Sequence, residues 1–225
     1  PSGQYRGLRQ IDDEEERRKA RQRIQRAERQ SMQLLKQWWM ERILNTPRPL
    51  EEKMTLFWHG HFATSAQKVR TSTLNYDLHS RFRNNAVGNF KTLTVAVAKS
   101  PAMLQYLDNN RNVKQHPNEN WARELMELFT LGIGNYTEDD IKESARAFTG
   151  WTAGPKGFTV RYKVHDEGSK TFLGHSGNFD GRDIIDIIFE QPATAEFLAK
   201  KLYLFFVSDT LDEAIIQAMA DDLRT

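Results

Sequence analysis

The stretch Asn118–Gly132, NENWARELMELFTLG, decides the fold class, because its apolar residues recur at helical spacing. On a helical wheel, Trp121, Leu125, Leu128 and Phe129 fall in one arc, and the charged residues occupy the opposite arc. The glycine at the end of the stretch supplies a C-terminal stop. We therefore predict an amphipathic helix that packs one side on a core.

The segment that follows, YTEDDIKESARAFTGW (136–151), predicts a second helix. Thr137 begins a capping box with Asp140, and Ile141 and Phe148 recur on one face. Further helical patterns cover residues 12–44, 90–99 and 101–109, and begin near Leu50, Asp180 and Pro192. Residues 193–207 are apolar nearly all round and should be buried, whereas 68–89 predicts a loop with a short helix.

Period-two alternation occurs in one place, GFTVRYKV (157–164), followed by a turn at 166–168 and a short apolar run. This pattern predicts one small β-hairpin near 158–173. The fold class is thus mainly α, a multi-helix globular domain with one hairpin. We divide the chain into a charged N-terminal helix and arm, residues 1–48, and a helical core domain, residues 49–225.

Composition excludes several classes of protein. Hydrophobic residues make up 39% of the chain and charged residues 28%, which is typical of a folded globular domain. The formal net charge is +2, and acids alternate with the basic residues of 17–29, so we expect no nucleic-acid partner. Without cysteine, disulfides and thiolate metal sites are impossible. The chain also has no P-loop, dinucleotide fingerprint, nucleophile elbow or HExxH motif, and no apolar run long enough for a membrane span.

Candidate chemistry centres on Glu124 and Glu127, whose i,i+3 spacing places both carboxylates on neighbouring turns. His59 and His61, from the helix near Leu50, could add nitrogen ligands, so these four residues form a candidate site for a divalent metal ion. In a second reading, Glu124 is a general base and His61 assists it as a catalytic residue. Four further histidines, His79, His116, His165 and His175, are expected in loops or in the hairpin.

Other polar residues could contact a ligand beside that site. Asn120 lies one turn before Glu124, Arg123 lies between the acids, and Arg146 could reach them from the next helix. With His59, these three are the candidate ligand-binding residues.

Each candidate also has a structural interpretation. Arg123 could be neutralised by Glu119 and Glu127, and His61, which falls within an apolar arc, could be a core histidine bonded to a backbone carbonyl. Arg146 could form a buried ion pair rather than bind an anion, and Glu124 could anchor a hydrogen bond. The sequence leaves both interpretations open.

Four segments, 52–65, 87–109, 117–151 and 170–209, resemble successive blocks of the bacterial domain-of-unknown-function 1800 family. Members of that family are roughly twice this length, and the last residues, IIQAMADDLRT, still keep helical spacing, so we expect this chain to be a fragment. The basic helix of residues 1–48 matches no motif of the family that we can identify.

The resemblance implies a lineage rather than a reaction. It implies a periplasmic or secreted location, and a partner of the secreted alkaline-phosphatase or sulfatase type encoded nearby. We therefore expect an exported helical domain with a His/Glu/Arg site for a metal or a polar envelope ligand, hydrolysis being the reaction class if there is one. The alternative is a non-catalytic envelope scaffold or binding module with a buried polar network.

Overall fold

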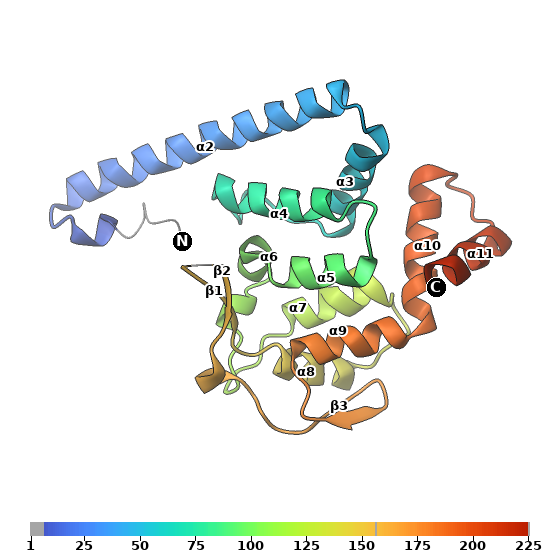
Figure 1. Ribbon diagram of the computed structural model, residues 1–225. Helices are drawn as coiled ribbons and strands as arrows, with labels where there is room; N and C mark the ends of the chain where they lie inside the picture. The colour runs from blue at the N-terminus through green and yellow to red at the C-terminus, as the bar shows by residue number, and fades with distance from the viewer. Residues whose placement is uncertain (1–6, 156, 225) are drawn as a thin grey trace.

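A group of short helices surrounds one apolar core in the computed structural model, which describes residues 7–155 and 157–224 (Figure 1). Around the core lie α3 (Pro49–His61), α4 (Ser72–Asn84), α5 (Phe90–Ala98), α6 (Pro101–Tyr106), α7 (Asn120–Glu124), η3 (Leu125–Thr130), α8 (Glu138–Ala147) and α9 (Gly181–Glu190). Their inward side chains, such as Phe62, Leu93, Leu125 and Phe148, are fully buried. The mainly α class predicted from the sequence is confirmed, although α5, α6 and α9 contribute to the core beside the helices that we expected to build it.

Helix α2 (Glu14–Asn45) runs along one side of the molecule, above α4 in the view of Figure 1. None of its residues is buried, and it packs on α4 along its length rather than entering the core. The Trp38 ring lies 5.7 Å from that of Tyr76, and Glu28 accepts hydrogen bonds of 2.8 Å from both the backbone and the side chain of Ser72. The first six residues of the predicted N-terminal arm lie outside the described residues.

Helix ends follow the capping residues that the sequence indicated. Thr137 and Asp140 form a reciprocal capping box at α8, and Asp180 caps α9 in the same way with Asp183. These bonds satisfy amide groups of the first turn that have no partner inside a helix. The two helices are therefore fixed at their starts by local chemistry that can be read from the chain.

The prediction of one hairpin over 158–173 is wrong in its pairing. β1 (Trp151–Gly154) pairs antiparallel with β2 (Gly157–Val160), and β3 (Lys170–Phe172) pairs antiparallel with β4 (His175–Gly177). Each strand finds its partner across a tight local turn, so two small hairpins form instead of one. Between them, Tyr162–Val164 forms the 3-10 turn η4. Alternation identifies an extended segment but not its neighbour.

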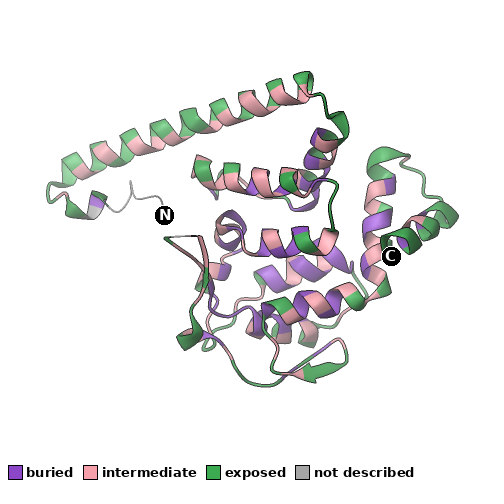
Figure 2. Cartoon of the chain, in the orientation of Figure 1, coloured by how far each residue is buried: buried purple, intermediate pink, exposed green. Residues whose placement is uncertain are grey.

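The C-terminal pair of helices lies at one edge of the fold, where α10 (Pro192–Phe206) packs on α11 (Glu213–Arg224). The prediction that residues 193–207 are buried is wrong at their end, because Leu204 is 44% and Val207 61% exposed. At this edge α10 is covered by α9 and η3 on one side and by α11 on another, and its last turn faces solvent (Figure 2).

Two short 3-10 turns, η1 (Leu8–Gln10) and η2 (Asn109–Arg111), precede α2 and α7 in the chain. Within 68–89, where the sequence predicted a loop and a short helix, the helix is α4 and spans 13 residues. None of the helices in the described part has the length and apolar character that a membrane crossing requires.

Candidate functional site

The stretch Asn118–Gly132 is not one regular helix, because α7 widens into the π-helix η3. At the end of η3, the amide groups of Leu131 and Gly132 both donate to the Met126 carbonyl at 2.9 Å. Carbonyl groups at a helix end need partners from elsewhere. Here the Leu128 carbonyl accepts from Lys201 Nζ at 2.7 Å, and the Phe129 carbonyl bonds His61 Nε2 at 2.9 Å.

His61 is a core histidine that caps η3. It is 5% exposed, and its ring stacks on Phe57 with the two ring planes 29° apart. Because a carbonyl oxygen can only accept, His61 must carry its proton on Nε2, which leaves Nδ1 buried without a partner. Burial, reinforced by the charge of Lys201, lowers the pKa of His61 to about 3, although the bond to Phe129 opposes this shift. The ring is therefore neutral near pH 7.

His59 lies on the opposite side of α3 and faces α4 and α2. Its Nε2 atom lies 3.1 Å from Nδ1 of His79, and its ring lies 4.5 Å from the Trp39 ring. Burial and the neighbouring histidine lower the pKa of His59 to about 4, and burial lowers the pKa of His79 to about 4 as well. The expectation that His79 lies in a loop is wrong, since it is a buried residue of α4.

The two predicted acids of α7 and η3 have different surroundings. Glu127 accepts a hydrogen bond of 3.3 Å from the Tyr136 hydroxyl. Glu124 is half-buried, and among the described residues it makes no hydrogen bond or ion pair. Burial, with the nearby charge of Glu127, raises the pKa of Glu124. Asn120, at the start of α7, donates its backbone amide to Asn118 Oδ1 at 3.0 Å.

Arg123 is neutralised on the surface, but not by the acids of its own helix alone. Its guanidinium donates to both carboxylate oxygens of Glu138, at 2.9 and 2.8 Å, and to Glu119 at 3.3 Å. The structural interpretation of Arg123 is thus correct for Glu119, while the second partner is Glu138 of the next helix rather than Glu127.

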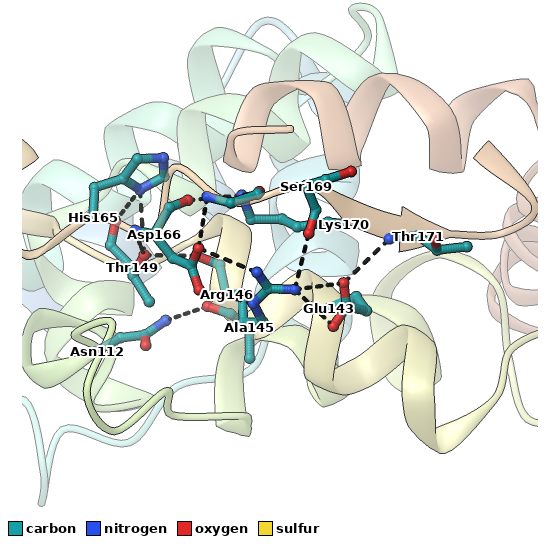
Figure 3. Close-up of polar contacts among 11 residues, drawn as sticks. Asn112, Glu143, Ala145, Arg146, Thr149, His165, Asp166, Ser169, Lys170 and Thr171 are labelled. Carbon is teal, nitrogen blue, oxygen red and sulfur yellow. Dashed lines mark hydrogen bonds and ion pairs between the residues drawn. The ribbon is translucent and has the colours of Figure 1, made fainter. Parts of the chain in front are cut away.

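Arg146 does not reach the acids of the preceding helix, which corrects the prediction that it does. Figure 3 shows its guanidinium between Glu143 and Asp166, with hydrogen bonds of 2.8 Å to each. It also donates to the Ser169 carbonyl at 3.2 Å. Beside it, the fully buried Lys170 donates to the carbonyls of Asp166 and Gly168, so α8 and the loop before β3 share one polar network.

The expected metal ligands are not brought together. His59 and His61 point to different neighbours, and Glu124 and Glu127 contact neither histidine through any bond among the described residues. Nor does that part of the chain contain any group of three or more His, Cys, Asp or Glu side chains that could hold a metal ion. The reason is the two-residue spacing of the histidines, which turns their side chains about 200° apart on a helix.

Sequence reasoning missed two buried charged groups, Glu52 and Lys170, and the half-buried Lys201. Glu52, only 2% exposed, accepts hydrogen bonds from Trp39, Arg42 and Arg83 at 3.3, 2.9 and 2.7 Å. For Lys201 a signal existed, because a lysine inside the apolar run 193–207 requires a polar partner. For Glu52, an acid in a first helical turn gives no sign of burial.

A wide cleft lies elsewhere on the molecule. It has a volume of about 680 Å³ and opens between α3, α5, α9, α10 and α11, with Trp58, Phe90 and Phe189 among its lining residues. Lys91 and Asp186 form an ion pair of 2.7 Å within this lining. None of the candidate residues predicted from the sequence lines this cleft.

Comparison with known proteins identifies the family of the chain. The model of the family described as "Protein of unknown function (DUF1800)" matches residues 3–225, so the chain belongs to this family. The match includes helix α2, which inspection of the sequence did not connect to the family. No curated protein and no solved structure matches the chain.

Proposed function

We propose that this member of the DUF1800 family is a non-catalytic scaffold or binding module of the bacterial envelope, in which buried His, Glu and Arg side chains hold the helices together. The observation that carries the proposal is the use of these side chains within the protein. His61 caps η3, and Arg146 joins α8 to the loop before β3. Glu52 ties α2, α3 and α4 together through three donors. A group so engaged is not available to a substrate.

The location of the module and its partner are supported by the family resemblance. That resemblance favours a periplasmic or secreted protein that works with a secreted protein of the phosphatase or sulfatase type. Deleting the gene of that partner and measuring how much of this protein is recovered in the envelope fraction would test the location and the partner together.

A hydrolytic function is the second candidate, and one observation favours it. Glu124 is half-buried without a bonded partner among the described residues, and burial raises its pKa. A carboxylate in these surroundings is a stronger base than an exposed one and could activate water. Glu127, which accepts a hydrogen bond from the Tyr136 hydroxyl, would then help to position the water molecule whose proton Glu124 takes.

Replacement of Glu124 by Gln separates the two candidates, with Glu119→Gln, an acid of the same stretch that pairs with Arg123 on the surface, as the matched control. Both variants are compared with the parent protein for urea unfolding and for hydrolysis of p-nitrophenyl acetate, phosphate and sulfate. A module without catalysis predicts that Glu124→Gln leaves turnover at background and stability unchanged or higher, because a carboxylate with a raised pKa disfavours the folded state at neutral pH. If the parent protein hydrolyses one of these esters and Glu124→Gln does not, at unchanged stability, the result contradicts the non-catalytic module and supports the hydrolase.

A further inference from the structure

Lys201 is a half-buried cation without a counter-ion. Its ammonium group makes one hydrogen bond, to the Leu128 carbonyl at 2.7 Å, and lies 4.7 Å from the centre of the Phe197 ring. No carboxylate among the described residues forms an ion pair with it. An ammonium group has three protons to donate, so two remain without a partner in the protein. Burial lowers the pKa of Lys201, and no acid opposes this shift.

The charge of Lys201 is not compensated by its surroundings either. It lies close enough to His61 to help lower the pKa of that imidazole, which means that two basic groups share this region. The half-buried ammonium group therefore keeps donor positions that a carboxylate entering beside it could accept from.

A cleft gives an anion access to Lys201. The cleft has a volume of about 540 Å³ and lies between the loop after η3 and helices α10 and α11. Lys200 lines it beside Lys201, and its apolar lining residues are Leu131, Ile133, Ala193, Phe197, Leu204 and Ile216. Ile133 is 81% exposed. A volume of this order suits a small ligand.

Acidic residues in the lining decide the charge that the ligand can carry. Glu196 lines the cleft but bonds Arg224 at 2.8 Å, and Glu213 lies on α11. With two acids in the lining, a doubly charged phosphate would meet repulsion that a single carboxylate meets less. Lys200 and Lys201 both line the cleft, and Glu196 is paired with Arg224, so Glu213 leaves one positive charge unbalanced. Together with the apolar lining, this charge fits a singly charged head group with an apolar chain.

We propose that this cleft binds an amphipathic carboxylate, with its head group on Lys201 Nζ and its hydrocarbon chain along Phe197, Leu204 and Ile216. The ligand's carboxylate supplies the counter-ion that the protein lacks, and its chain covers apolar surface that is otherwise exposed to water. The inference rests on the proposed function, because it names the ligand class of the binding module.

Octanoate is the probe, and its binding to the whole chain is measured by isothermal titration calorimetry. Lys201→Met keeps most of the side chain over Phe197 but removes the charge, and Lys142→Met is the control at an exposed lysine of α8 that does not line the cleft. We expect saturable binding to the parent protein, a loss of at least about tenfold in affinity for Lys201→Met, and less than about twofold for Lys142→Met. Octanol and octyl phosphate should both bind more weakly than octanoate.

The variant Lys201→Arg separates loss of the charge from loss of the fold. It keeps a cation at the Leu128 carbonyl, so it should retain octanoate binding. Equal affinity in Lys201→Met and the parent, or no saturable binding to the parent at millimolar octanoate, would overturn the proposal. Such a failure leaves the binding module itself intact, since that function is judged by the Glu124→Gln comparison.

Discussion

Three neutral histidines, the buried His61 and His79 and the half-buried His59, predict that the protein loses stability steeply in mild acid. His61 has a pKa lowered to about 3, and His59 and His79 have pKa values lowered to about 4, in each case mainly through burial. In the unfolded chain a histidine titrates near pH 6.5. Between these limits, unfolding takes up protons, so stability is complete above about pH 6.5 and falls as the pH approaches the folded pKa values.

The size of the effect follows from proton counting. At about pH 5 the three imidazoles are nearly all protonated in the unfolded chain and nearly all neutral in the folded one, a difference of almost three protons. Each proton contributes ~1.4 kcal/mol per pH unit, so the slope should reach roughly 3–4 kcal/mol per pH unit between about pH 6 and 5. Such a loss is comparable with the whole stability of a typical domain.

Urea unfolding followed by tryptophan fluorescence at several values between about pH 7 and 5 measures this slope. The control is Thr137→Ala, which removes the α8 cap and should lower the unfolding free energy by about 1 kcal/mol at every pH without changing the slope. His79→Phe should reduce the slope by about a third. A slope below about 1 kcal/mol per pH unit in the parent protein would refute the assignment of three neutral imidazoles with lowered pKa values.

Two further substitutions test the packing directly. Glu52→Gln should lower the unfolding free energy by about 3 kcal/mol, because it removes a buried charge that Arg42 and Arg83 both require; urea unfolding measures the loss, and a change below about 1 kcal/mol would contradict the role given to Glu52. Gly181→Ala should cost about 1–3 kcal/mol, because its methyl group would lie 2.8 Å from Trp151 Cζ2 and would also meet the Phe148 ring; an unchanged melting temperature would show that the start of α9 has room.

The elements that the sequence predicts well are those with local causes. The capping box at Thr137 and the helix start at Asp180 depend on residues close together in the chain, and both form as expected. The burial of His61 follows from its place within an apolar arc of α3, and the structure confirms it. Membership of a known family could also be predicted, because long blocks of residues in a fixed order identify it.

The rest depends on contacts that are distant in the chain. β2 pairs with the preceding β1, and nothing in its alternation indicates which neighbour it takes. His59 meets His79 across 20 residues, and Lys201 reaches Leu128 across 73. The π-helix at η3 is equally hidden, since its sequence fits a regular α-helix and the bonds that favour it come from other elements.

The most direct test of the account is the unfolding free energy of His61→Phe at neutral pH. The variant keeps an aromatic ring beside Phe57 and Trp58 but leaves the Phe129 carbonyl without its donor. If the imidazole caps η3, stability should fall by about 1–3 kcal/mol. An unchanged unfolding free energy would contradict the claim that this buried histidine stabilises the fold. His61 would then again be a candidate for ligand binding or catalysis.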